Sequence, residues 1–282
     1  MLAWICPRCA KPLLPSANCR CGACGFMLRR DEGVWISAET FRPEHFSEDR
    51  RDHLAHLAES HFWFDARARL LTRILDRLPL ASRAAVLEIG CGTGGFLPVL
   101  RERFEAVVGV DGYASSLHAA RDRSPEATLI QADANRIPLG SAQFDLVVAL
   151  DVLEHLDPAR FLAETTRLIR PGGHLLLSVP AFPLLWGPAD ARAGHRCRYR
   201  RGQLADELEQ SGWTPRGSAY YQCLLFPAML LARQAAGHSL DRVERAPPAW
   251  LGRMFGAINR LEVAMLGHRA PFGTSLIMWA QR

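Results

Sequence analysis

A glycine-rich turn directly after an apolar segment constrains this chain more than any other feature of its sequence. Residues 86–95 read VLEIGCGTGG, and Glu88 is the only charged residue among them. Glycine lets the backbone approach a ligand at positions where a Cβ atom would intrude. A helix that follows such a turn directs its N-terminal amide groups toward the same place. The run therefore predicts a nucleotide pocket at the end of a buried strand.

The glycines do not decide the type of nucleotide, because Gly90, Gly92 and Gly95 also fit the GxGxxG spacing of a dinucleotide site. Asp111 follows a second apolar segment, where its carboxylate would bind ribose hydroxyls in either kind of site. Glu88 does distinguish the two, because a carboxylate beside the turn repels a pyrophosphate but attracts the ammonium and sulfonium groups of S-adenosylmethionine. The turn is therefore predicted to bind this methyl donor.

Further motifs follow the glycine run in order. The matching segments are 88–94 (EIGCGTG), 110–111 (VD), 131–134 (QADA), 144–155 (FDLVVALDVLEH) and 168–177 (LIRPGGHLLL). Together they resemble the ordered motifs of the class I S-adenosylmethionine-dependent methyltransferases, in a bacterial type similar to methyltransferase types 11 and 12. The resemblance implies a transferase that methylates an acceptor and binds its donor at the carboxyl ends of the strands.

The resemblance also implies a set of donor-binding residues. Those around the turn and the following strand ends are Glu88, Gly90, Cys91, Gly92, Gly94, Asp111, Gly112, Asp133, Ala134 and Asp151, with Asp133 beside the adenine amino group. The stretch HFWFDAR at 61–67 resembles a segment that precedes the glycine motif in a bacterial subset of these enzymes. There Trp63 and Arg67 would cover the methionine end of the donor, with Arg67 on its carboxylate. Simple packing of the aromatic triplet is the alternative.

The sequence predicts an α/β fold. Apolar segments at about 85–90, 106–111, 127–132, 143–150 and 174–179 alternate with helical patterns, which is the βαβ arrangement of a doubly wound parallel sheet. In the family that the chain resembles, the last strand inserts antiparallel. We therefore expect a Rossmann-like sheet of seven strands, in which 273–280 is antiparallel and has a partner near 214–221.

Two Cys-x-x-Cys pairs near the N-terminus, Cys6 with Cys9 and Cys21 with Cys24, are separated by eleven residues. This spacing suits four thiolates around a tetrahedral zinc ion. Cys19 is an alternative to Cys21, and ordinary thiols, a redox pair or a rubredoxin-type iron site are alternatives to zinc. A segment of this size cannot hold a core of its own, so bound zinc would supply its folding free energy.

These patterns divide the chain into expected domains. They are a zinc-ribbon-like segment at 1–38, a helical N-terminal cap at 39–80, a methyltransferase domain at 81–222 and 270–282, and a helical substrate-cap insert at 223–269. In the N-terminal cap, Leu54 and Leu57 share one helical face, and a second helix carries Leu70, Leu71, Ile74, Leu75 and Leu78.

Two segments in the second half of the chain are expected to determine which acceptor molecule is methylated. Residues 192–201 read RAGHRCRYRR, with five arginines and one histidine, and are a candidate site for an anion. A solvated loop is the alternative. Residues 220–233 are apolar on nearly every face. They predict either a buried cap helix or a membrane-surface element that offers a groove to a lipid-linked substrate.

Methyl transfer is a direct displacement at the sulfonium carbon, so the protein mainly aligns the acceptor, the methyl group and the sulfur. A general base is needed only where the acceptor loses a proton. His155, directly after the fourth motif, and His195, in the arginine-rich loop, are the candidate catalytic residues. A purely structural histidine is the alternative at either position.

The chain has 282 residues, 49% hydrophobic content and a net charge of +5. This is enough for one full domain with an appendage. We expect no secretory leader, because the first cysteines follow Met1 closely, and the sequence has no uncharged run of about 18 apolar residues. We therefore expect a cytoplasmic protein without a transmembrane span, with peripheral membrane contact as an option.

Taken together, the sequence predicts an S-adenosylmethionine-dependent methyltransferase for an anionic small-molecule, lipid or glycan acceptor. Similar zinc ribbons precede the catalytic domain of some ribosomal RNA methyltransferases, so an RNA methyltransferase docked by its ribbon is an alternative. Only Lys11 and Arg20 are basic between Cys9 and Cys21, which is few for a nucleic-acid surface. A regulator that binds the donor without turnover is a second alternative.

Overall fold

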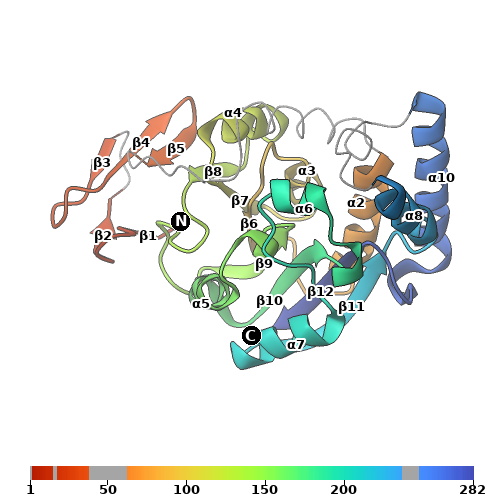
Figure 1. The fold of residues 1–282 in the computed structure, drawn as a ribbon. Coiled ribbons are helices and arrows are strands. Elements are labelled where there is room, and N and C mark those ends of the chain that lie inside the picture. The colour runs from red at the N-terminus through yellow and green to blue at the C-terminus, as the bar shows by residue number, and fades with distance from the viewer. Residues whose placement is uncertain (1, 15–17, 38–61, 237–247) are drawn as a thin grey trace.

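The computed structural model describes residues 2–14, 18–37, 62–236 and 248–282. One mixed sheet runs through the centre of the molecule, and helices pack along it (Figure 1). The order of its strands is β11-β12-β10-β9-β6-β7-β8-β5-β4-β3. The predicted α/β class with a parallel central sheet is therefore confirmed.

The central seven strands agree with the sequence prediction. They are β6 (Ala85–Ile89), β7 (Ala106–Asp111), β8 (Thr128–Gln131), β9 (Phe144–Leu150), β10 (Ile169–Pro180), β11 (Thr214–Tyr221) and β12 (Ser275–Gln281). Strands β6 to β10 are parallel where they pair, and β12 inserts antiparallel between β10 and β11. Strand β10 begins earlier than predicted, because Ile169 already pairs with Phe144 before an irregularity that ends at His174.

The N-terminal segment extends this sheet. Strands β3 (Asn18–Arg20), β4 (Met27–Asp31) and β5 (Val34–Ser37) join it, whereas β1 (Trp4–Ile5) and β2 (Pro12–Leu13) form a separate two-stranded sheet. Strand β5 pairs in parallel with β8, with Trp35 opposite Ile130, so the sheet has ten strands where the sequence predicted seven. The added strands cover an edge of β8 that would otherwise expose unpaired backbone groups.

Eight α-helices lie within the described residues. They are α2 (Phe62–Leu75), α3 (Leu97–Arg101), α4 (Ala114–Arg123), α5 (Pro158–Leu168), α6 (Pro188–Arg192), α7 (Arg201–Gln210), α8 (Phe226–Ala236) and α10 (Ala249–Met265). Short 3₁₀ turns are η1 (Leu153–His155), η2 (Pro183–Leu185) and η3 (Gly267–Arg269). The leucines and the isoleucine predicted for the second helix of the cap are buried on and after α2. The predicted helical face with Leu54 and Leu57 lies outside the described residues.

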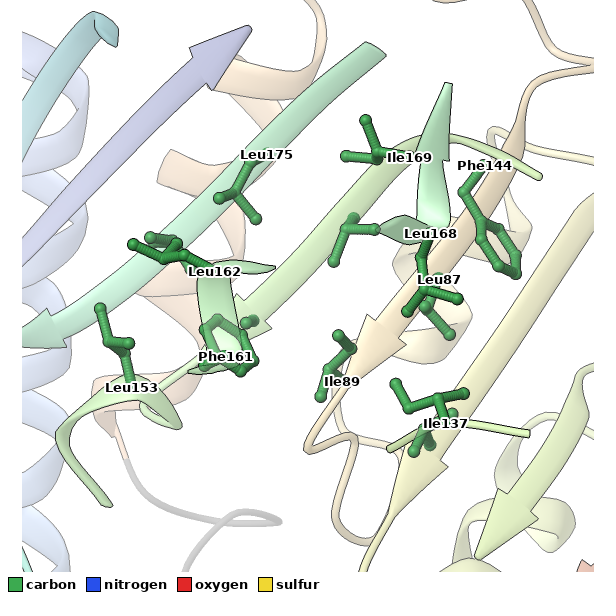
Figure 2. Packing of buried hydrophobic residues seen from close by; sticks show 14 of the residues in the cluster. Leu87, Ile89, Ile137, Phe144, Leu153, Phe161, Leu162, Leu168, Ile169 and Leu175 are labelled. Carbon is green, nitrogen blue, oxygen red and sulfur yellow. The ribbon is translucent and has the colours of Figure 1, made fainter. Parts of the chain in front are cut away.

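The hydrophobic core has two layers, one on each face of the sheet, because successive strand residues point to opposite faces. Leu87 and Ile89 of β6 belong to the layer under α5, which Phe161 and Leu162 complete (Figure 2). Val86 belongs to the other layer, which α2, α3 and α4 cover. Side chains alternate between the two layers along β6 and β9. Because β6 to β9 pair in parallel, their carboxyl ends meet at one edge of the sheet.

Candidate functional site

The glycine turn follows β6 at the carboxyl edge of the sheet. Gly90, Gly92 and Gly94 all have positive φ angles, of 73°, 53° and 79°. An added Cβ would collide with Val152 at Gly90, and would lie 2.9 Å from Ala120 at Gly94, whereas no atom lies within 4 Å at Gly92. The turn therefore needs glycine for its conformation, and the backbone at Gly92 borders open space that a ligand can approach closely.

Asp111 ends β7 and is tied to this turn. Its Oδ2 accepts a hydrogen bond of 2.9 Å from the Gly92 amide, and its Oδ1 accepts one of 2.9 Å from the Tyr113 amide. The next residue, Gly112, offers its carbonyl to Gln131 Nε2 at 3.1 Å. The two predicted contact residues at 111 and 112 thus lie against the glycine turn, although they follow a different strand.

Asp133 and Ala134 follow β8, the next strand along the edge. Asp133 Oδ1 accepts hydrogen bonds from the amide and from the side-chain nitrogen of Asn135, at 2.8 and 3.0 Å. Both predicted residues are partly exposed. The carboxyl ends of β6, β7 and β8 therefore present acidic residues in the order that the motifs predicted.

Glu88 precedes the turn on β6 and is a buried acid. It is 3% exposed, and within the described residues its Oε2 accepts no hydrogen bond. Burial raises the pKa of this carboxyl to about 8, with the charge of Asp111 adding to the rise and that of Arg67 opposing it. A buried carboxyl of this kind is suited to a cationic ligand, which would restore its charged form.

Buried Arg67 pairs with the partly exposed Asp151 near Glu88. The guanidinium donates to Asp151 Oδ2 at 2.6 Å and to Ser178 Oγ at 2.8 Å, and Ser178 Oγ donates to Asp151 Oδ1 at 3.0 Å. Asp151 has a φ of 57° at the end of β9, a conformation that a non-glycine residue adopts at some cost. Trp63 lies in α2, and its side chain is outside the described part of the chain.

A second network links the arginine-rich loop to η1. Asp190 and Arg198 are both buried and ion-paired at 2.6 Å, and Asp190 Oδ1 also lies 3.1 Å from His195 Nδ1. The rings of His155 and His195 are 4.9 Å apart in an edge-to-face arrangement. The structure therefore brings the two candidate catalytic residues together, and it uses Arg198 internally, so Arg198 does not face an anion from solvent.

Glu154 belongs to the same network and was missed by the sequence analysis. It is 1% exposed, between the end of β9 and the loop that carries His195. Its burial raises the pKa of its carboxyl well above the ordinary value. One sequence feature could have identified Glu154. It stands directly before the candidate catalytic residue His155, in a turn that is otherwise apolar.

The four predicted cysteine ligands converge in the N-terminal segment. Cys6 Sγ lies 3.4 Å from Cys24 Sγ, and Cys9 Sγ lies 3.5 Å from Cys21 Sγ, with all four sulfurs within 4.8 Å of one another. The backbone amides of Ala23 and Cys24 lower the pKa of the Cys21 thiol to about 6. Cys19 is buried on β3 and is not a member of this group. The arrangement can hold a tetrahedral metal ion.

Comparison with known proteins identifies the central part of the chain. A family model described as a methyltransferase domain matches residues 87–177, which run from the glycine turn into β10. This chain carries a class I methyltransferase domain. The predicted resemblance to the S-adenosylmethionine-dependent methyltransferases is thereby confirmed for this segment of the chain.

Named relatives support the methyltransferase domain. The chain is 34% identical over 125 residues to a probable S-adenosylmethionine-dependent methyltransferase of Mycolicibacterium smegmatis, covering 44% of this chain and 48% of that protein. It is 40% identical over 119 residues to a trans-aconitate 2-methyltransferase of an Azoarcus species, covering 41% and 47%. The chain therefore spans about half the length of the curated relatives that it matches.

A solved structure extends the similarity to most of the fold. The S-adenosylmethionine-dependent methyltransferase of Mesorhizobium loti aligns with a TM-score of 0.54 at 18% identity, covering 80% of this chain and all of that one. At this identity the comparison shows a shared fold. The likeness in sequence, by contrast, is centred on the methyltransferase domain with the glycine turn and the acidic strand ends.

Replacing Gly90 by alanine is expected to damage this domain. The added Cβ meets Val152, and the φ of 73° is unfavourable for alanine. We expect the free energy of unfolding to fall by about 2–4 kcal/mol, with donor binding weakened as the turn shifts. Gly95→Ala is the matched control, because nothing lies within 4 Å of its added Cβ. Thermal unfolding compares the two variants, and equal losses would contradict this account of the turn.

Proposed function

We propose that this protein is an S-adenosylmethionine-dependent methyltransferase whose acceptor is anionic and is a lipid or is linked to one. Buried Glu88, with an oxygen that accepts no hydrogen bond within the described residues, is the observation that supports donor binding most directly. In its charged form this carboxyl would repel a phosphate-bearing dinucleotide and attract a cationic methyl donor.

The residues present fit this donor. When bound, it supplies an electrophilic methyl group on a positively charged sulfur. Glu88 would hold the positively charged end, Asp111 the ribose hydroxyls and Asp133 the adenine amino group. We propose that the backbone of Cys91, Gly92, Gly94, Gly112 and Ala134 borders the ligand, with open space beside Gly92. Arg67 holds Asp151 in the structure, so we propose that Asp151 contacts the donor and that Arg67 fixes its position.

Exposed apolar and basic side chains near the arginine-rich loop support an amphipathic anionic acceptor. Leu184 of η2 is 68% exposed, and Trp186, two residues later, is also exposed. Arg196 and Arg200 are exposed in the loop after α6. A guanidinium favours phosphate or carboxylate, and the apolar side chains favour a hydrocarbon part of the same ligand. We place His155 and His195 on this acceptor side of the reaction.

Helix α10 favours a lipid acceptor over a soluble one. Its buried residues include Asn259 and Glu262, whereas its exposed face carries large apolar side chains. These are Trp250, Met254, Leu261 and Met265, whose spacing places them along one stripe. Such a stripe, beside Arg253 and Arg260, is typical of a helix that lies in a membrane surface. Among the described residues, none of the helices has both the length and the apolar character to cross a bilayer.

The test uses the full chain loaded with zinc. Calorimetric titration with S-adenosylmethionine is expected to show binding, and a radiolabelled methyl assay on fractionated cell extract is expected to label the lipid extract. Absence of donor binding would overturn the whole proposal. Label confined to RNA would overturn the acceptor class and favour the ribbon-docked RNA methyltransferase.

The proposed binding of α10 to a membrane surface is tested separately, with vesicles that contain phosphatidylglycerol. The double variant Trp250→Ser, Leu261→Ser should float less with vesicles than the unchanged chain, because it removes apolar area from the exposed stripe. Leu14→Ser is the control, since Leu14 is an even more exposed apolar residue but lies on the N-terminal segment. Equal flotation of all three proteins would contradict the docking of α10.

We propose that Cys6, Cys9, Cys21 and Cys24 bind a structural zinc ion. Their four sulfurs lie within 4.8 Å of one another, and thiolates in this number are typical ligands of structural zinc. The ion would link the β1–β2 turn to the turn between β3 and β4. Since β5 extends the sheet from the same segment, the zinc would also stabilise the edge beside β8.

Cys21→Ser is expected to lose this zinc and to lower the thermal stability of the N-terminal segment, because three thiolates and a hydroxyl bind zinc less tightly. Cys19→Ser is the matched control and should keep the metal. Atomic absorption and thermal unfolding measure the two effects. Loss of zinc in the Cys19 variant with retention in the Cys21 variant would assign the third ligand to Cys19.

A further inference from the structure

A buried acid and two histidines converge where the arginine-rich loop crosses η1. Glu154 and His155 come from η1, and His195 follows α6. One ligand atom of each residue lies within 4.8 Å of the others, and His195 Nε2 is 4.0 Å from Glu154 Oε1. We propose that Glu154, His155 and His195 form a binding site for a divalent transition-metal ion, separate from the cysteine cluster.

The first support is the state of Glu154. Within the described residues, neither of its carboxylate oxygens accepts a hydrogen bond, although the side chain is fully enclosed. The nearby cations are engaged elsewhere, because Arg67 binds Asp151 and Arg198 binds Asp190. A buried carboxyl without hydrogen bonds is costly, and a metal ion on its oxygens removes that cost.

The second support is the orientation of the two imidazoles. His195 Nδ1 lies 3.1 Å from Asp190 Oδ1, and His155 Nδ1 lies 3.4 Å from the carbonyl oxygen of Gly194. The Asp190 carboxylate favours a proton on Nδ1 of His195, which directs the Nε2 lone pair of that ring toward Glu154 and a ligand. A carboxylate or carbonyl behind a histidine is the usual arrangement around a bound metal.

The backbone holds the two halves of the site together. The Arg196 amide donates to the Glu154 carbonyl at 2.7 Å, and the His195 amide donates to the Asp190 carbonyl at 3.0 Å. Asp190 is itself fixed by Arg198. The histidine from the loop is therefore fastened beside η1 by main-chain hydrogen bonds as well as by side chains.

The ligand set of two imidazoles and one carboxylate indicates which class of metal ion the site would bind. This ligand set suits zinc, cobalt or nickel, whereas magnesium and calcium prefer oxygen ligands alone. Bonds of about 2.1 Å in a tetrahedral site place ligand atoms about 3.4 Å apart, so the three groups must move inward by a modest amount. Three protein ligands leave a position for water or, resting on the proposed function, for an oxygen of the anionic acceptor.

The test is a titration of metal-free full-length protein with Co²⁺, followed by absorption spectroscopy. The unchanged chain should take up two equivalents, one with thiolate-to-cobalt charge-transfer bands from the cysteine cluster and one without them. Glu154→Gln and His195→Ala should each lose the equivalent that lacks these bands and keep the other. Circular dichroism confirms that each variant is folded.

Two substitutions outside the site serve as matched controls. Glu207→Gln on α7 and His118→Ala on α4 remove the same kinds of side chain and should leave both equivalents in place. Uptake of only the thiolate-bound equivalent by the unchanged chain would overturn the inference, as would retention of both equivalents in Glu154→Gln. The titration contains no methyl donor, so its failure is distinguishable from failure of the proposed methyl transfer.

Discussion

Replacing Glu88 by glutamine is expected to weaken S-adenosylmethionine binding by about 100-fold, while making the donor-free protein more stable at pH 8. The first effect follows because a buried carboxylate that meets a cationic ligand contributes about 3 kcal/mol to binding. The second follows because the buried acid is destabilising without that ligand. Calorimetric titration and thermal unfolding of the two proteins measure these opposite changes.

The pH dependence gives this prediction a definite sign. The pKa of Glu88 is about 8 in the folded protein, against a usual value of 4.5. Between these values the folded state keeps a proton that the unfolded state has lost, so this residue lowers stability as pH rises from 4.5 toward 8. Above pH 8 its contribution becomes constant. The glutamine variant lacks this slope, and donor affinity of the unchanged chain should rise with pH over the same range.

A matched substitution separates this effect from a general loss of charge. Glu207→Gln on α7 removes a half-buried carboxyl far along the chain from the glycine turn and should bind donor as the unchanged chain does. Donor affinity in Glu88→Gln equal to that of the unchanged chain would show that Glu88 does not face the donor. An unchanged melting temperature at pH 8 would contradict the destabilising role of its burial.

A chain that ends at Thr274 is expected not to fold. It lacks β12, which forms antiparallel ladders with β10 on one side and β11 on the other. Leu276, Ile277 and Met278 of this strand are fully buried. Removing these side chains costs about 10 kcal/mol, which is comparable to the whole stability of a typical domain. Soluble yield and circular dichroism of the shortened chain measure the loss.

Gln281→Ala provides the control for this truncation. Gln281 lies at the end of β12 and binds Arg216 and the Gly172 carbonyl at the surface, so its loss leaves both ladders in place. We expect a change in stability below about 1 kcal/mol. A soluble chain ending at Thr274 with a cooperative unfolding transition would show that the remaining strands close the sheet without β12.

Local patterns in the sequence were sufficient for the methyltransferase part of the fold. Strands of consecutive apolar residues, helices with 3.6-residue periodicity and a glycine turn each arise from neighbouring residues, so their positions and the acidic strand ends could be predicted. The antiparallel insertion of β12 was predicted through resemblance to a family. The spacing of Cys6, Cys9, Cys21 and Cys24 likewise indicated which sulfurs converge.

The sequence by itself thus determined which acids stand at the strand ends and which cysteines can meet. Only the tertiary structure decided that β5 joins β8, that Arg198 is bound by Asp190, and that Glu154 lies enclosed beside His195. Each of these depends on packing between separate segments, because burial removes water and leaves a charge dependent on whichever groups the fold places nearby. The glycine turn predicts a pocket from the sequence alone, but the surrounding fold determines which charged groups face that pocket.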